Sequence, residues 1–93
     1  MRVAIVDDDA IVRTALTTYL TATPGFEIVH QCANGDEALA ALASRPVDVV
    51  IMDVRMPQRD GIQTTRELRR RHNAVKVLVI TSFDEDEAVR EAL

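Results

Sequence analysis

The sequence predicts an α/β fold in which helices cover both faces of a doubly wound parallel sheet. Short apolar runs alternate along the chain with stretches of helical periodicity. Three of the runs are nearly continuous rather than alternating, which is typical of strands buried on both faces. The expected strands are residues 3–6, 26–29, 47–52 and 75–80.

The first two helices are expected between these strands. The first carries apolar side chains at helical spacing, namely Ile11, Val12, Ala15, Leu16, Tyr19 and Leu20. We expect Tyr19 to pack in the core. The second covers residues 35–43, which are rich in the strong helix formers alanine and leucine.

Two further helices complete the pattern. The third is expected over residues 61–72, with Ile62, Thr65 and Leu68 facing inward. The fourth starts near Asp84 and reaches the end of the chain. The order is therefore β-α-β-α-β-α-β-α, with right-handed crossovers expected between parallel strands.

Composition restricts the class of protein. The 93 residues suit one domain, and a net charge of −4 makes it a poor candidate for binding nucleic acid by itself. The only cysteine, Cys32, allows no intramolecular disulfide, which suits the cytoplasm, and we expect it to be a small buried residue. No apolar run approaches the roughly 20 residues that span a bilayer.

Acidic and hydroxyl side chains stand just past the expected strands. Asp7 and Asp8 follow the first strand, Asp53 the third, and Thr81 the fourth. In open α/β sheets ligands bind beyond the carboxyl ends of the strands. Carboxylates that converge there need a counter-ion, and Mg²⁺ suits carboxylates together with phosphate oxygens. The acidic turn also argues against a dinucleotide site, which needs a glycine-rich turn.

Four segments carry a family resemblance: Val6-Asp7-Asp8, residues 52–57, Asp60-Gly61 and residues 79–83. Together they resemble the receiver domain of two-component response regulators, and residues 53–57 and 81–84 look most like the NarL/LuxR-type transcription regulators. The resemblance implies a flavodoxin-like, CheY-like fold and covers the whole chain. It implies a signalling switch rather than an enzyme.

The resemblance also implies roles for individual residues. Asp53 matches the phospho-acceptor, and Asp7 and Asp8 match the acidic pair that helps bind Mg²⁺, Asp8 being the more direct ligand. Arg55 matches the position whose backbone carbonyl completes the metal shell. Thr81 matches the switch hydroxyl that turns toward the phosphoryl group.

Two more residues, Pro57 and Gly61, match positions that shape the loop after the third strand. The implied partner is a sensor histidine kinase, and a homodimer on phosphorylation is left open. DNA would be bound by a C-terminal helix-turn-helix domain in the parent protein, and no membrane contact is implied.

Each of these residues could instead have an ordinary structural role. Asp8 could cap the first helix, Asp53 could be an ordinary loop residue, and Thr81 a β-branched residue at a strand end. Two other functions are alternatives: an interaction module that no longer signals by phosphorylation, and a Mg²⁺-dependent phosphohydrolase. The phosphohydrolase ranks last because no further general base or substrate pocket is indicated.

The sequence departs from the family pattern at its C-terminal end. Residues 1–93 match a receiver domain that is truncated after the start of the fourth helix, without a fifth strand or fifth helix. The family's fifth-strand lysine has no counterpart, because the only lysine, Lys76, starts the fourth strand. That strand would then be an edge strand, which invites pairing with another chain. We expect a fragment of a longer receiver or a protomer completed by a partner.

Overall fold

The computed structural model describes residues 1–53, 61–72 and 74–80. Three predicted site residues, Arg55, Pro57 and Thr81, lie outside the described residues, and so does the helix expected from Asp84. Over the described part of the chain, strands and helices alternate in the predicted order.

The described strands form one parallel sheet in the order β2-β1-β3-β4. Their bounds are Arg2–Val6 for β1, Glu27–Cys32 for β2, Val49–Asp53 for β3 and Lys76–Ile80 for β4. The chain moves from β1 outward to β2, and then crosses to β3 and β4 on the other side of β1. The direction of winding therefore reverses between β1 and β3, the place where sheets of this type bind ligands.

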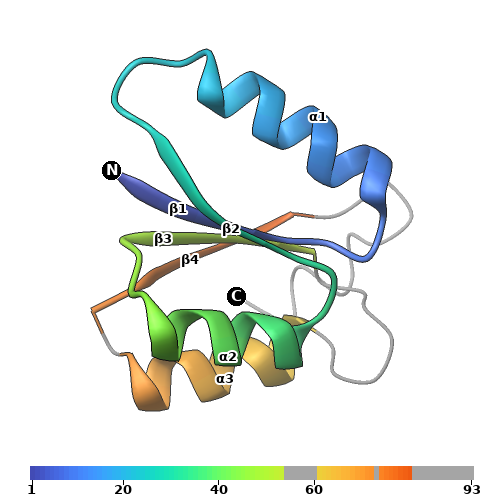
Figure 1. Cartoon of the computed structure of the whole chain (residues 1–93). Coiled ribbons are helices and arrows are strands. Elements are labelled where there is room, and N and C mark those ends of the chain that lie inside the picture. Colours follow the sequence, from blue (N-terminus) through green and yellow to red (C-terminus); the bar gives the residue numbers. More distant parts are fainter. Residues whose placement is uncertain (54–60, 73, 81–93) are drawn as a thin grey trace.

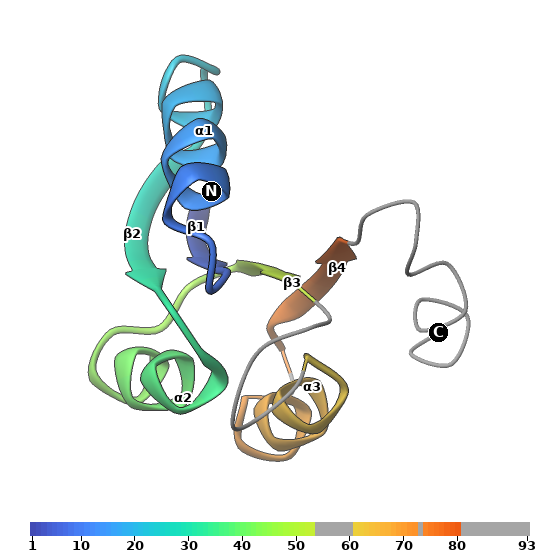
Figure 2. The same ribbon diagram turned by 90° about the vertical axis from the view of Figure 1, so that its right-hand side faces the viewer.

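The helices lie on both faces of this sheet. Helix α1 (Ala10–Thr21) lies on one face, while α2 (Gly35–Ser44) and α3 (Gly61–Arg71) lie side by side on the other (Figures 1 and 2). The predicted doubly wound arrangement is thus confirmed.

The core fills the space between the sheet and the α2–α3 layer. Its members are aliphatic side chains and one thiol: Ala4, Val6, Cys32, Ala38, Leu39, Leu42, Val47, Val50, Met52, Leu68 and Val75. Cys32 is only 3% exposed, which confirms its prediction as a small buried residue. An aliphatic core of this kind agrees with an aromatic content of 3%.

The prediction that Tyr19 packs in the core is wrong. Tyr19 is 72% exposed and Ile11 is 80% exposed, and none of the described residues of α1 is buried. The reason is the layering of the molecule: among the described helices only α1 lies on its face of the sheet, so no second helix covers its flanks (Figure 2).

Some boundaries differ from the sequence prediction. Strand β2 runs on to Cys32, because residues 30–32 pair with residues 4–6 of β1 despite the polar side chains of His30 and Gln31. Strand β3 includes Asp53, which pairs with Ile80. Both shifts come from pairing with a neighbouring strand, which an apolar pattern does not reveal.

The buried face of α3 is also placed differently. Leu68 faces the core as predicted, but Thr64 is fully buried while Ile62 and Thr65 are half-buried. Residues four apart share one helix face, so the inward line runs through Thr64 and Leu68. Among residues 1–53, 61–72 and 74–80 we find no helix with the length and apolar character that a membrane crossing needs.

Candidate functional site

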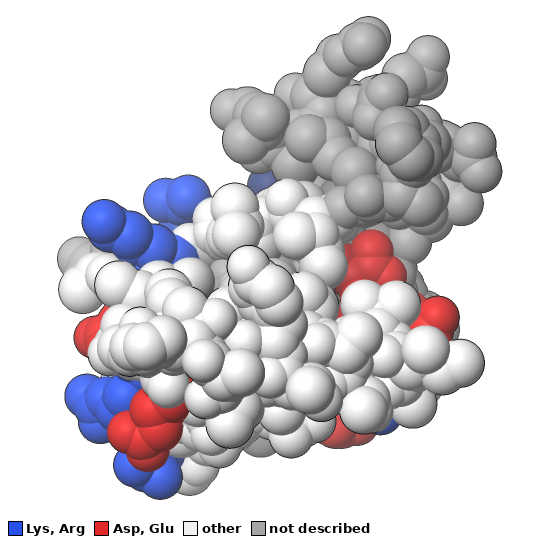
Figure 3. All heavy atoms as spheres, turned by 90° about the horizontal axis from the view of Figure 1, so that it is seen from above, with Lys and Arg blue, Asp and Glu red and all other residues white. Residues whose placement is uncertain are grey.

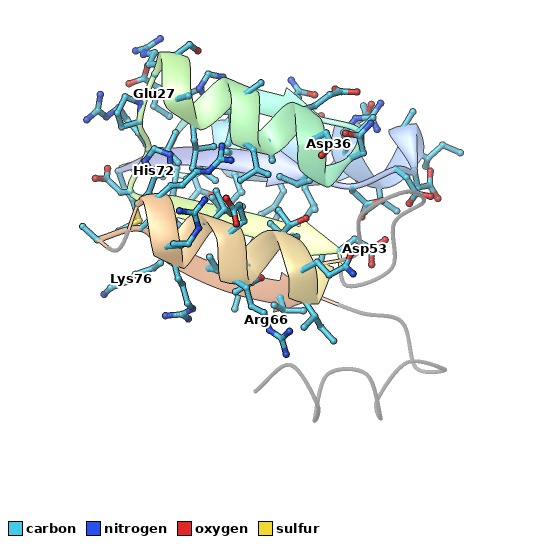
Figure 4. The ribbon with its side chains drawn as sticks, turned by 90° about the horizontal axis from the view of Figure 1, so that it is seen from below. Glu27, Asp36, Asp53, Arg66, His72 and Lys76 are labelled. Atoms are coloured by element: carbon cyan, nitrogen blue, oxygen red, sulfur yellow. The ribbon has the colours of Figure 1, made fainter. Side chains whose placement is uncertain are left out.

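Three carboxylates meet at the reversal of winding between β1 and β3. Asp7 and Asp8 directly follow β1, and Asp53 is the last residue of β3. Each offers a carboxylate oxygen, and these oxygens all lie within 4.8 Å of one another. The expectation that these three side chains converge is confirmed, and Figure 4 shows Asp53 at the end of the sheet opposite Lys76.

The turn between β1 and α1 is held by a series of hydrogen bonds. The Asp7 backbone N–H donates to the Cys32 carbonyl at 3.0 Å, which ties the turn to the end of β2. The Asp7 carboxylate accepts a bond of 2.8 Å from the Asp9 N–H. Asp9 in turn caps α1, because its carboxylate accepts a bond of 2.9 Å from the Ile11 N–H. The cap role considered for Asp8 therefore belongs to Asp9.

An arginine from α1 also contacts this turn. The Arg13 guanidinium donates to the Asp7 carbonyl, and the Arg13 backbone N–H donates to the Asp9 carbonyl at 3.0 Å. Arg13 was not among the site residues predicted from the sequence. A basic residue one helical turn beyond a run of three acids was the signal that could have identified it.

Burial determines the electrostatics of Asp7. The residue is only 4% exposed, and the resulting loss of hydration is the main reason why the pKa of its carboxyl is raised. The neighbouring charges of Asp8 and Asp9 raise the pKa further, while the hydrogen bond from Asp9 and the positive charge of Arg13 oppose the shift. A buried carboxylate beside like charges is stabilised by a cation.

The three carboxylates suit a hard divalent cation. They offer only oxygen atoms, which Mg²⁺ prefers, and none of the soft ligands that favour transition metals. Oxygens on opposite sides of a Mg²⁺ ion with bonds of 2.0–2.1 Å lie about 4.2 Å apart. The spread of at most 4.8 Å among the carboxylate oxygens is close to that span.

Two other residues considered in the sequence, Gly61 and Lys76, lie outside the carboxylate cluster. Gly61 is the first residue of α3. Lys76 starts β4, four residues before the Ile80 that pairs with Asp53, so it lies at the far end of the strand. When the molecule is viewed from the α1 side, acidic side chains are visible at both ends, and those on the left lie beside basic side chains (Figure 3).

Comparison with known proteins gives the family. The response regulator receiver domain family matches residues 3–93, and the chain belongs to it. Within this family the response regulator GacA of Pseudomonas viridiflava is 41% identical over 86 residues, which cover 92% of this chain and 40% of GacA. The response regulator protein VraR of Staphylococcus aureus is 36% identical over 93 residues, 100% of this chain and 44% of VraR. The chain thus spans about two-fifths of the length of these relatives.

Solved structures agree with the NarL/LuxR-type resemblance. The receiver domain of the putative response regulator NarL from Mycobacterium tuberculosis superposes with a TM-score of 0.89 at 30% identity, over 98% of this chain and 73% of that one. A LuxR-family response regulator from Aurantimonas sp. SI85-9A1 gives 0.86 at 30% identity, over 98% of this chain and 67% of that one.

Proposed function

We propose that this chain is a phosphorylation switch in which Asp53 accepts a phosphoryl group from a histidine kinase with the help of Mg²⁺. The observation that carries the proposal is the meeting of Asp53 with Asp7 and Asp8 at the carboxyl ends of β1 and β3. Membership of the receiver family supports it.

Asp53 acts as the nucleophile. One of its carboxylate oxygens attacks phosphorus and forms the aspartyl phosphate. The bond between phosphorus and the donor breaks at the same time, which is a P–N bond for a phosphohistidine, and the leaving nitrogen takes the electron pair. Positioning and charge stabilisation supply most of the catalysis in such transfers.

Asp7 and Asp8 would hold the metal together with Asp53. When bound there, Mg²⁺ would supply positive charge to offset the negative charge that builds up on the phosphoryl oxygens. Asp8 is exposed and free to contact the ion directly, while Asp7 is buried and held by the Asp9 N–H, so it fixes the inner wall of the site. We assign the backbone carbonyl of Arg55 to the same metal shell from the family resemblance.

The output of the switch depends on residues after β3 and β4. We assign to Thr81 the hydroxyl that turns toward the new phosphoryl oxygens, and to Pro57 and Gly61 the shaping of the intervening loop. A phosphoryl group adds charge and strong acceptor oxygens, which can draw a hydroxyl inward and bias a two-state surface.

The proposed setting is a cytoplasmic response regulator. Its receiver is controlled by a sensor kinase and does not itself contact nucleic acid. The parent protein would bind DNA through a C-terminal helix-turn-helix domain, and phosphorylation would promote a homodimer. Residues 1–93 would form the larger part of its receiver domain, since they span 73% of the NarL receiver domain.

Phosphorylation with a small donor tests the acceptor assignment. The full chain is incubated with acetyl phosphate and Mg²⁺, and intact mass is measured with and without EDTA. We expect the mass of one added phosphoryl group, dependent on Mg²⁺ and lost in Asp53→Asn. Asp9→Asn is the matched control, because Asp9 lies in the same acidic turn but outside the carboxylate cluster. Labelling that survives Asp53→Asn contradicts the assignment.

Two alternatives give different results in the same experiment. An interaction module that has lost phosphorylation takes up no phosphoryl group at any Mg²⁺ concentration. A Mg²⁺-dependent phosphohydrolase releases phosphate steadily, and the release persists in Asp53→Asn.

A further inference from the structure

We propose that Arg13 is a positioning residue for the metal site: its guanidinium fixes the peptide group between Asp7 and Asp8 in the orientation that Mg²⁺ binding requires. The inference rests on the proposed function of the acidic cluster. It adds to that function a residue of α1 that offers no ligand atom to the ion.

The first support is the place of Arg13 in the turn. It is half-buried on α1, and it contacts the turn twice. Its backbone N–H donates to the Asp9 carbonyl at 3.0 Å, and its guanidinium donates to the Asp7 carbonyl. One residue thus joins the first turn of the helix to the end of β1.

The second support is the atom that Arg13 contacts. The Asp7 carbonyl belongs to the peptide unit that links Asp7 to Asp8, and a peptide unit is planar. Holding this carbonyl therefore fixes the direction in which the chain leaves Asp7 and the place from which the Asp8 side chain starts. The backbone N–H of Asp7 donates a hydrogen bond to the Cys32 carbonyl, so both peptide groups of Asp7 are hydrogen-bonded.

The third support is the need for such a restraint. Three acids in sequence repel one another, and without a metal ion the repulsion favours an open turn. A cation that contacted the carboxylates directly would compete with Mg²⁺. Arg13 is hydrogen-bonded to the carbonyl instead, so it can hold the turn and leave the carboxylate oxygens to the metal.

The two effects of Arg13 have opposite signs, which makes the inference testable. As a positive charge near the site, Arg13 opposes Mg²⁺ binding, so its removal would tighten binding. As a positioning residue it favours binding, so its removal would weaken it. The direction of change in the variant Arg13→Met therefore separates the two roles.

The experiment is a calorimetric titration of the full chain with Mg²⁺, for wild type and three variants. We expect Arg13→Met to weaken Mg²⁺ binding about tenfold, the lower end of the range for residues that hold metal ligands in place. Arg13→Lys keeps the charge but has a shorter reach, so we expect it to lie between wild type and Arg13→Met. Arg69→Met is the control, because Arg69 is exposed in the last turn of α3 and its loss changes net charge equally.

A second measurement excludes a merely structural role. At saturating Mg²⁺ the Asp53 labelling rate of Arg13→Met should return to that of wild type, because excess ion compensates for the weaker binding. A general loss of folding would lower the rate at every Mg²⁺ concentration. If Arg13→Met does not fold, Arg13→Lys decides: weaker Mg²⁺ binding supports positioning, and unchanged binding contradicts it.

Failure of this inference is distinct from failure of the proposed function. Equal or tighter Mg²⁺ binding by folded Arg13→Met overturns the positioning role alone. A wild-type chain that binds no Mg²⁺ and takes up no phosphoryl group overturns the proposed function.

Discussion

Removal of one carboxylate from the acidic cluster should stabilise the metal-free protein. The variant Asp8→Asn keeps the size of the side chain and removes one of three charges that lie within 4.8 Å of one another. A pair of unit charges at this separation interacts by roughly 0.9 kcal/mol at the dielectric constant of water and by roughly 3.5 kcal/mol at an effective value near 20. Because Asp8 is exposed, the lower figure is the better guide.

Asp8 has two such neighbours, Asp7 and Asp53, so the relief of repulsion should amount to about 1–2 kcal/mol at low salt. For a domain of this size 1 kcal/mol shifts Tm by about 4–8 °C. We therefore expect Asp8→Asn to raise Tm by about 5–10 °C in EDTA, measured by circular dichroism. In about 1 M salt, where the Debye length is about 3 Å, most of the gain should disappear.

Mg²⁺ should reverse the order of stability. The ion binds the folded wild type and raises its Tm, whereas Asp8→Asn has lost a ligand and should gain little. Asp9→Asn is the matched control: asparagine caps a helix as well as aspartate does, and Asp9 is outside the cluster, so Mg²⁺ stabilisation should persist. The reasoning is refuted if the Tm of Asp8→Asn in EDTA is no higher than that of wild type. It is also refuted if Asp9→Asn raises Tm in EDTA as much as Asp8→Asn does.

Three further outcomes are expected. Thr64→Val should stabilise the fold by about 1 kcal/mol in urea unfolding, because the buried Thr64 hydroxyl has no hydrogen-bond partner among the described residues; a loss of stability contradicts this. Cys32 is buried with a pKa raised to about 11 mainly by burial, so iodoacetamide should alkylate it far more slowly in the native protein than in urea, and equal rates contradict this. The pKa of Glu67 is lowered to about 2, chiefly by its hydrogen bond from Arg70 and also by Arg71. The stabilisation from this carboxylate is fully present above its usual pKa of 4.5 and is lost as the pH falls toward 2. Glu67→Gln should therefore be less stable than wild type at pH 7, and the difference in stability should disappear on titration to acid pH.

Much of the fold could be predicted because local patterns of apolar residues indicate which segments form strands and helices. The nearly continuous apolar runs identified the central strands β1 and β3, since a strand covered on both faces needs apolar side chains on both. Strand β2 was predicted too short because His30 and Gln31 interrupt the pattern, and only pairing with β1 extends it to Cys32. Tyr19 was misplaced because helical spacing identifies a stripe of side chains but not what lies opposite it.

The candidate site, too, was predicted from the sequence only in part. The sequence by itself placed Asp7, Asp8 and Asp53 at the ends of strands, because parallel strands bring their carboxyl ends to one edge of a sheet. Only the tertiary structure decided how the acidic turn is held. Asp9 rather than Asp8 caps α1, and Arg13 binds the Asp7 carbonyl, since hydrogen bonds depend on directions and distances that residue types alone do not specify.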